Sequence, residues 1–332
     1  MRKFILISSI FIPSFVSASQ VSFNSLVEEG SSLAGVQIYL AEENIKLSNY
    51  EEALNNYITA SKNGVPSAIY NAIEMFNNGY GNKDSFIRLL PELEKEANRG
   101  SVDVSKAIAS LYMDSKIGDD MHQAFFWFNR AYKLGDDESA FKVVKMIIDD
   151  DLGDYYSYPE IATILRDLSN KGYGEASYRL SIMFSDGKYL KPNPTLSRKF
   201  IDLSVEQSFE YSYYLAGWYA EKGIGGDVDI DQAKKYYLMA SKIDERGLAE
   251  YRLSRFHLYG IASESVDPIK AVDLLKISAE KGNLDGIRKL AQLFELGIHN
   301  VEKSKTEAIK WYKLGSSLGD HQSKIAIEKL TK

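Results

Sequence analysis

The histidines are the first candidates for chemistry in this sequence, because the chain contains no cysteine. His122, His257, His299 and His321 lie in four separate segments and form no i, i+4 pair. A zinc site needs several nitrogen, sulfur or carboxylate ligands at short spacing. We therefore predict no zinc site and expect His257 to be a surface side chain.

Carboxylates are concentrated where Asp149, Asp150 and Asp151 are followed by Asp154. A calcium-binding loop places its acids at alternate positions, with a central glycine and a closing glutamate, and this segment lacks that spacing. We expect a solvated helix end and turn instead.

The neighbouring tyrosines Tyr155, Tyr156 and Tyr158 have two interpretations. They either form an exposed aromatic patch for a partner or fill core space left by an aromatic pair that this part of the chain lacks. The second interpretation is favoured.

No pattern typical of a catalytic or cofactor site is found. Gly223, Gly225 and Gly226 resemble a phosphate-binding loop, but they follow a predicted helix and no Lys-Ser/Thr pair comes after them, so we expect a turn between helices. No serine lies in a Gly-x-Ser-x-Gly motif within a suitable context, which would be a sharp turn between a strand and a helix. A hydrolase that uses two carboxylates is not excluded by composition, but no spacing selects a pair. We predict a non-enzymatic protein without cofactor or metal.

The elements that position these residues are repeats. A glycine that closes similar phrases recurs at intervals of 36, 35, 37, 110 and 37 residues, and 110 is three such periods. The glycines are Gly64, Gly100, Gly135, Gly172, Gly282 and Gly319. The two missing points fall at Ser208 and Asp244, where polar residues replace glycine. This period of about 36 residues indicates a stacked helical repeat.

Each repeat contains two helical patterns. Before the glycine, a small residue precedes a bulky pair by three and four positions, as in Ala308 with Trp311 and Tyr312, which describes one helix face. After it, apolar residues recur at i, i+4, i+7 and i+8, as in a second helix. We predict an all-α, right-handed superhelical solenoid of about eight antiparallel helix pairs over residues 31–319, with a capping helix at 320–332.

The repeats resemble the Sel-one-like family, a branch of the tetratricopeptide superfamily. The match is carried by Leu180–Gly187, Leu253–Gly260 and Ala308–Leu314. The resemblance implies a scaffold or adaptor without a catalytic centre, and many bacterial members are exported. Two repeats depart from the pattern, through Pro91 and through Ile164–Leu165, so we expect irregular curvature between residues 83 and 172.

The first eighteen residues have the pattern of a signal peptide, with Arg2 and Lys3, an apolar stretch and the small-x-small sequence Val16-Ser17-Ala18. We expect cleavage near Ala18-Ser19, a lead-in over 19–30, no membrane span in the mature chain, and a periplasmic or secreted protein. An uncleaved anchor is the alternative. Without Arg2 and Lys3, 38 basic and 46 acidic residues remain, a net charge near −8 that argues against nucleic acid as a partner.

One surface is a candidate for binding a protein. Positions seven and ten after each repeat-ending residue share a helix face, and with a one-residue shift in two repeats six of these fourteen residues are cationic. We predict that they line the inner surface and bind an acidic or carboxylate-bearing partner. The residues concerned are Lys142, Lys145, Arg179, Tyr214, Arg252, Arg255 and Lys289. Alternatively, they form weak surface ion pairs with acids such as Glu206, Glu210, Glu245 and Glu250.

The sequence thus favours a non-catalytic, exported protein-protein interaction scaffold that organises or regulates a complex at the bacterial cell envelope. A secreted factor that binds a host or competitor protein is the alternative. A polysaccharide- or wall-acting enzyme is the least favoured interpretation.

Overall fold

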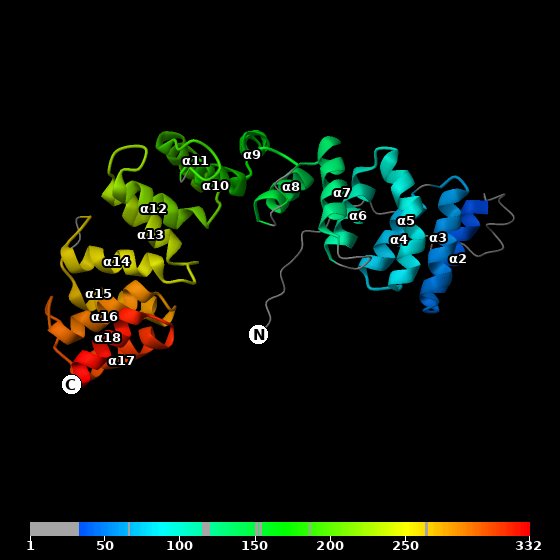
Figure 1. Ribbon diagram of the computed structural model, residues 1–332. Helices are drawn as coiled ribbons and strands as arrows, with labels where there is room; N and C mark the ends of the chain where they lie inside the picture. Colours follow the sequence, from blue (N-terminus) through cyan, green and yellow to red (C-terminus); the bar gives the residue numbers. More distant parts are fainter. Residues whose placement is uncertain are drawn as a thin grey trace. The chain divides into compact units, whose positions relative to one another are not determined.

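A computed structural model describes residues 33–332, apart from 66, 115–119, 150–151, 153–154, 186 and 263–264. These residues form seventeen α-helices and, within the described ranges, no strand (Figure 1). The all-α prediction is therefore confirmed. The chain divides into two compact units, Met1–Leu152 and Gly153–Lys332. The predicted signal peptide and lead-in lie outside the described residues.

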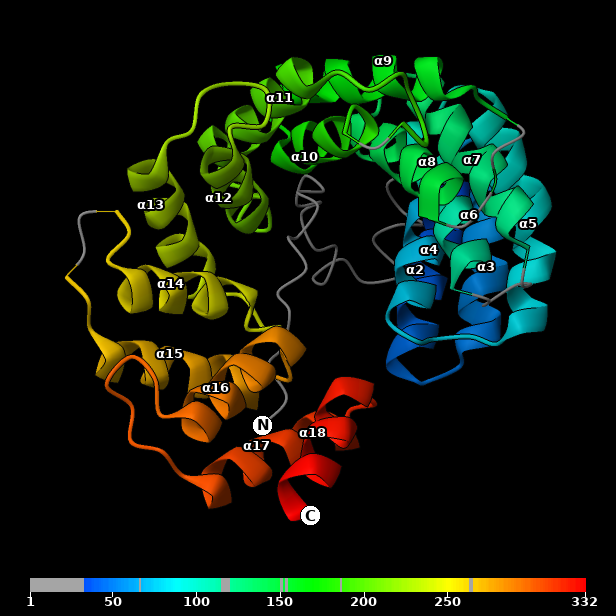
Figure 2. The same cartoon turned by 60° about the vertical axis from the view of Figure 1, so that its left-hand side comes forward.

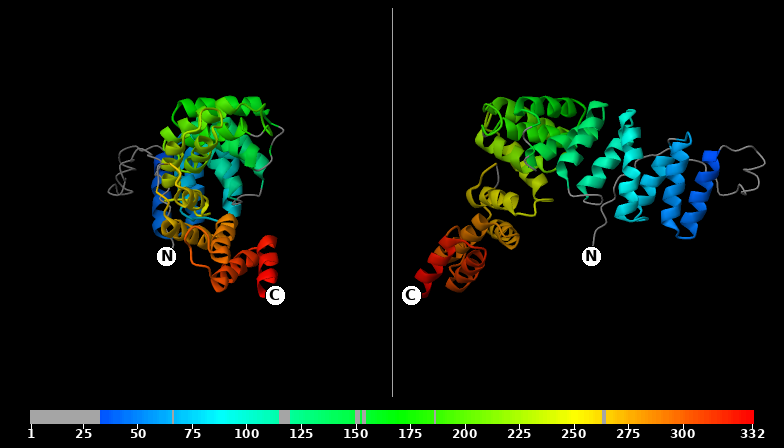
Figure 3. Two further views of the ribbon diagram at one scale, coloured as in Figure 1. Left: turned by 90° about the vertical axis from the view of Figure 1, so that its left-hand side faces the viewer. Right: turned by 45° about the vertical axis from the view of Figure 1, so that its right-hand side comes forward.

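The first unit contains seven of the helices, and neighbouring helices stand side by side in Figure 3. They are α2 (Leu33–Lys46), α3 (Tyr50–Lys62), α4 (Ala68–Asn77), α5 (Lys83–Asn98), α6 (Val102–Met113), α7 (Met121–Lys133) and α8 (Asp137–Asp149). Pro91 lies inside α5, where it removes one backbone donor from the helix.

The second unit contains ten helices. They are α9 (Tyr158–Asn170), α10 (Gly174–Met183), α11 (Pro194–Glu206), α12 (Ser212–Lys222), α13 (Ile230–Ala240), α14 (Leu248–Tyr259), α15 (Pro268–Glu280), α16 (Leu284–Leu296), α17 (Lys305–Ser317) and α18 (His321–Thr331). No helix in the described part of the chain is long and apolar enough to cross a bilayer.

The repeated small residues lie where helices pack most closely. The equivalent positions are fully buried at Ala53, Ala124, Ser197, Ala233, Ala271 and Ala308. The bulky residues one turn later are also core residues, as at Trp127, Tyr237 and Tyr312. The helix face predicted from the small residue and the bulky pair is thus a core face at these positions. Burial of the same face in every repeat is what makes the pairs stack.

The repeat-ending glycines close each second helix in the left-handed region, with φ between 82° and 101°. After five of these six glycines, the next residue donates its N–H to the carbonyl five positions earlier, as in Asp136 to Ala131 and Asp320 to Gly315. This is the Schellman arrangement, which satisfies carbonyls left over at a helix end. Ser208 takes the same conformation, with φ of 61°, and Phe209 donates to Ser204, so the predicted replacement of glycine at Ser208 is confirmed.

The predicted replacement at Asp244 is wrong. Gly247, three residues later, has the left-handed φ of 68°, and Asp244 instead accepts a hydrogen bond from the Ala249 N–H at 2.9 Å. A Cβ on Gly247 would come within 2.6 Å of the Ser278 carbonyl oxygen, so only glycine fits. The connection between α13 and α14 therefore contains more residues than the repeat period predicts.

The loops inside the four pairs from α10 to α17 end in one shared arrangement. Each second helix begins at an N-cap residue whose side chain accepts the N–H three residues on, and the N-caps are Asn193, Asp229, Asp267 and Ser304. The N–H of each N-cap donates to a carbonyl near the end of the first helix, at Phe184, Ala220, His257 and Phe294 respectively. Both ends of the loop are thereby fixed, although the loop sequences differ.

The last helix, α18, begins at Asp320, which lies against the preceding pair. Its carboxylate accepts hydrogen bonds from the N–H and hydroxyl of Ser323 and from Arg288 at 2.8 Å. Burial, the largest influence, would raise the pKa of Asp320, but these hydrogen bonds and the Arg288 charge lower it overall.

We predict that Asp320→Ala loosens α18. Loss of the N-cap should cost about 1 to 2 kcal/mol, so that amides of α18 exchange about tenfold faster in hydrogen-exchange mass spectrometry. The control is Asp273→Ala, which removes only an exposed ion pair with Lys276 and should change stability by less than about 0.5 kcal/mol. Equal exchange in the two variants would contradict the role of Asp320.

Candidate partner-binding surface

The first helices of four successive pairs, α10, α12, α14 and α16, lie on the inner side of the second unit (Figure 2). Side chains of α12 contact those of α14, and side chains of α14 contact those of α16. We call these four helices the inner layer. The side chains of the inner layer that point away from the core are the ones available to a partner of this unit.

The burial pattern fixes which positions of the inner layer are equivalent. Two adjacent buried residues and a third two positions on recur in each helix, as at Leu253, Ser254 and Phe256. The two surface positions beside them are Arg179 and Ile182 in α10, Leu215 and Trp218 in α12, Arg252 and Arg255 in α14, and Lys289 and Gln292 in α16.

The one-residue shift assumed for α12 is therefore wrong, whereas that for α14 agrees with this register. Gly217, expected on the surface beside Tyr214, is buried, and a Cβ there would lie 2.8 Å from the ring of Tyr237. The surface of α12 is formed by Leu215 and Trp218, both half-buried. On the inner layer, the apolar and aromatic surface of α12 thus lies between the basic residues of α10 and α14.

Glu221, at the end of α12, is the centre of the basic part of this surface. Its carboxylate is 3.3 Å from Arg255, 3.6 Å from Arg252 and 3.2 Å from Lys222. The hydroxyl of Tyr237 in α13 donates to the other carboxylate oxygen at 2.7 Å. Three cations therefore share one carboxylate, and an excess of positive charge remains.

The titration of Glu221 reflects these contacts. Burial is the largest single influence and would raise the pKa of Glu221, because a charged carboxylate loses water when buried. The hydrogen bond from Tyr237 and the charges of Arg252 and Lys222 outweigh it, so the pKa is lowered overall. Burial and the same carboxylate raise the pKa of the Tyr237 phenol.

Tyr214 joins the same cluster although the observed register places Leu215, not Tyr214, at the surface position. It is half-buried, its ring centre is 5.7 Å from that of Tyr237, and its hydroxyl accepts a hydrogen bond from Nε of Arg252 at 3.5 Å. Tyr214 therefore holds one edge of the Arg252 guanidinium.

The remaining predicted residues are distributed over both units. Arg179 pairs with Glu175 on its own helix at 3.2 Å. Lys289 donates to the hydroxyl of Tyr259 at 2.9 Å. Lys142 and Lys145 lie on α8 of the first unit, the former half-buried and the latter exposed. In the structure Tyr214 contacts Arg252, and Arg252 and Arg255 share the carboxylate of Glu221, while the other four lie elsewhere.

Ion pairing occurs at this surface, but the acid that faces the two arginines is one the sequence did not single out. Glu206, Glu210 and Glu245 are exposed, and Glu250 is buried, where it pairs with Lys281. Glu221 could have been found from the repeat. Glu221 and Glu295 both stand two residues before a helix-ending glycine, and each accepts a 2.7 Å hydrogen bond from a core tyrosine, Tyr237 or Tyr312.

Between these two repeats, the corresponding positions are apolar. Leu258 stands two residues before Gly260, and Leu275 occupies the tyrosine position, both buried. A glutamate two residues before the glycine is thus found with a tyrosine on the next helix, and a leucine with a leucine. The reason is that a buried carboxylate requires a hydrogen-bond donor.

Other candidates from the sequence have different outcomes. The surface prediction for His257 is wrong, because the residue is only 4% exposed. Its carbonyl accepts the N–H of Asp267, the N-cap of the next helix. Tyr155 and Tyr158 are exposed, and Tyr158 packs on Tyr189 with ring centres 5.0 Å apart, so they do not fill core space. The Gly223–Gly226 segment is a turn between helices, as predicted.

In the described part of the chain, no group of three or more histidine and acidic side chains lies close enough together to hold a metal ion. Asp150, Asp151 and Asp154 lie outside the described residues.

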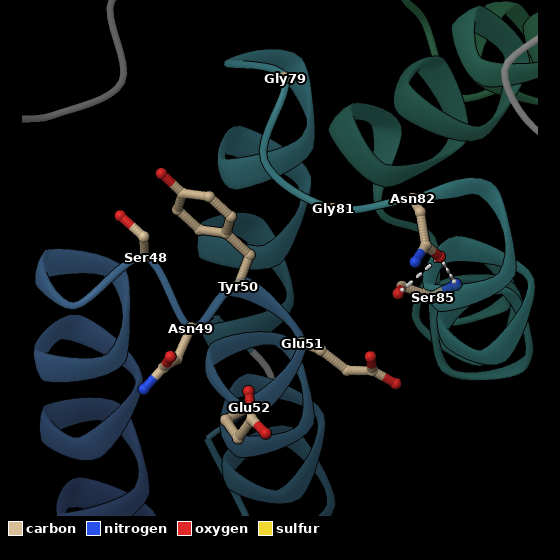
Figure 4. Close-up of a pocket in the computed structure, with 9 residues that line it drawn as sticks. All are labelled: Ser48, Asn49, Tyr50, Glu51, Glu52, Gly79, Gly81, Asn82 and Ser85. Carbon is tan, nitrogen blue, oxygen red and sulfur yellow. Dashed lines mark hydrogen bonds between the residues drawn. The ribbon is translucent and has the colours of Figure 1, made fainter.

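A polar pocket is present in the first unit, at the loops before α3 and α5 (Figure 4). Its polar groups are used locally. Asn82 caps α5 through the N–H of Ser85 at 2.9 Å, Glu51 pairs with Arg88, and Tyr50 stacks on Tyr80. The pocket is explained by helix capping and loop packing.

Comparison with known proteins agrees with this architecture. The model of the Sel1 repeat matches residues 107–136, 174–209, 210–244, 247–283 and 284–320, more than half of the chain. The match to the next repeat begins at Gly247, the residue that has the left-handed conformation in this connection.

Two solved structures are similar in fold. One is c5321, a protective antigen present in uropathogenic Escherichia coli strains, with a TM-score of 0.71, 20% identity, and coverage of 93% of this chain and 67% of that one. The other is a Sel1 repeat protein from Oxalobacter formigenes, with a TM-score of 0.70, 19% identity, and coverage of 93% and 89%.

Antiparallel helix pairs with a constant core and a variable first-helix surface define a protein of the helical-repeat class. Within that class, the chain belongs to the Sel1 repeat family, whose members are generally protein-protein interaction scaffolds. The resemblance predicted from the sequence is confirmed.

The tyrosine-glutamate pairs can be tested at Tyr312. We predict that Tyr312→Phe lowers the free energy of unfolding by about 1 to 2 kcal/mol, because Glu295 loses its donor. The same change at Tyr259, which is exposed, should cost less than about 0.5 kcal/mol. Urea unfolding of both variants checks this, and equal losses would exclude a structural role for the pair.

The pH dependence of Glu221 follows from its lowered pKa. Its contribution to stability should be complete above the unfolded-state pKa of about 4.3 and should be lost as pH falls through the folded-state pKa. The stability difference between the wild type and Glu221→Gln should therefore be constant from pH 7 to about pH 5 and shrink below it. Urea unfolding of both proteins at several pH values measures this, and a difference that does not change down to pH 3 would contradict it.

Proposed function

We propose that this protein is a non-catalytic, exported scaffold that organises or regulates a protein complex at the bacterial cell envelope. Its family supports the scaffold role. The signal-peptide pattern of residues 1–18 supports export. The partner is a protein that presents an acidic or carboxylate-bearing segment to the inner layer of the second unit.

The observation that carries this proposal is the shared carboxylate of Glu221. Arg252, Arg255 and Lys222 surround one acid. The positive charge that this acid does not balance is available to bind a second acid, supplied by the partner. In a chain whose net charge is −6, such a local excess of positive charge favours an acidic partner.

Tyrosine, tryptophan and arginine are the residues most enriched among those that dominate binding energy at interfaces. Tyr214, Trp218, Arg252 and Arg255 occur together on the inner layer, and none is fully buried. The surface is preformed by helices, which lowers the cost of ordering it on binding.

The experiment is immunocapture of the full-length, C-terminally tagged chain from its native cells, read by mass spectrometry. We expect a stoichiometric envelope protein that is retained by the wild type and lost, by at least about tenfold, with Arg252→Gln/Arg255→Gln. The control variant is Lys199→Gln/Lys235→Gln, which removes the same charge from exposed positions on α11 and α13. Retention of the same protein by all three would contradict binding at the inner layer.

Fractionation of the same cells tests the location. The tagged chain should be released with the periplasm or found outside the cell, without residues 1–18. A chain that stays in the cytoplasm with its first residues intact would contradict export.

A further inference from the structure

We propose that Arg252 and Arg255 bind a carboxylate of an extended peptide segment in competition with Glu221, and that Trp218 receives an apolar residue of the same segment. This inference rests on the proposed function, since it specifies the partner's recognised element and a limit that the protein itself sets on affinity.

The position of Glu221 makes it a fixed competitor. Its side chain is only 7% exposed, whereas those of Arg252 and Arg255 are 20% and 30% exposed. Tyr237 holds the carboxylate from the core side at 2.7 Å. The acid therefore cannot follow the arginines outward, but the arginines, on flexible stems, can turn toward a ligand.

Both arginines have donors to spare. A guanidinium group has five N–H donors, and within the described residues Arg252 hydrogen-bonds only to Tyr214, and Arg255 only to Glu221. A further ion pair, at 3.6 Å, joins Arg252 to Glu221. The forks that remain match the two oxygens of an incoming carboxylate.

Trp218 supplies the apolar part of the site. It lies three residues before Glu221 on α12, so both side chains share one helix face. The ring packs on the core cluster of Ile201, Ala216 and Tyr219 and is half-buried, which holds it rigidly while leaving part of it accessible.

The helix spacing sets the pattern of the ligand. Trp218 and Arg255 occupy the same surface position on α12 and α14, and axes of packed helices are about 8 to 10 Å apart. An extended chain advances about 3.3 Å per residue. The apolar residue and the acid should therefore be about three residues apart in the bound segment.

The competition has an unusual consequence for mutation. Glu221→Gln keeps an amide oxygen that can accept the Tyr237 hydrogen bond, but it removes the negative charge. The affinity for an acidic segment should then rise by about five- to tenfold, whereas Arg252→Gln/Arg255→Gln should lower it by at least about tenfold. A merely structural role for Glu221 predicts no gain in affinity.

The test uses the purified full-length chain and a phage-displayed library of random linear peptides. We expect selection of peptides that carry Asp or Glu about three residues from a bulky apolar residue. Synthetic copies of the strongest one, with the acid or with its Gln or Asn isostere, are then titrated by calorimetry against the wild type, Glu221→Gln, Arg252→Gln/Arg255→Gln, Trp218→Ala and the control Lys199→Gln/Lys235→Gln.

The outcomes separate the possibilities. Weaker binding of the isostere, tighter binding by Glu221→Gln, and weaker binding by the arginine and Trp218 variants, with every variant folded at the assay temperature by circular dichroism, would support the inference. No acidic selection, or weaker binding by a folded Glu221→Gln, would overturn it. Retention of the envelope protein in the immunocapture would then still leave the scaffold function standing, with a different recognised element.

Discussion

The stacking of repeats in the second unit depends on hydrogen bonds that cross from one repeat to the next near the helix ends. The hydroxyls of Ser204 and Ser278 donate to the carbonyls of Gly174 and Gly247, which lie about one repeat earlier in sequence. Lys281 donates to the Asp244 carbonyl, and Gln207 to that of Ser169. The carbonyls of Gly247 and Ser169 also accept the backbone N–H of Tyr251 and Gly172, so the side chains from the next repeat add a second hydrogen bond to them. Stacking is thereby directional as well as apolar.

This constraint separates the residues that must be kept from those that are free to vary. Small residues and aromatic rings are buried where helices and turns meet, so they recur in each repeat. The outward positions of the inner layer have no such demand, and they change from Arg179 to Leu215, Arg252 and Lys289 in successive helices. A surface of mixed chemistry is therefore carried on a uniform core, which suits a protein that recognises others.

The candidate site arises where the two sets of residues meet. Glu221 accepts a hydrogen bond from the core tyrosine Tyr237 and also faces the surface residues Arg252 and Arg255. A matching pair occurs at Glu295 and Tyr312, and no cation of the described residues forms an ion pair with it. The tyrosine-glutamate pair thus occurs in two repeats. At α12 it is part of the candidate site because α14 places two arginines beside the glutamate.

The sequence alone determined the period, the two helices of each pair, the core positions and the family, because glycine conformation and apolar spacing act within a few residues of the chain. It could not reveal the register of α12, the burial of His257, or the grouping of Glu221 with Arg252, Arg255 and Tyr237. Those features depend on contacts between helices about 16 to 34 residues apart in sequence. Only the packing of α12, α13 and α14 decides which of many similar charged residues share one carboxylate.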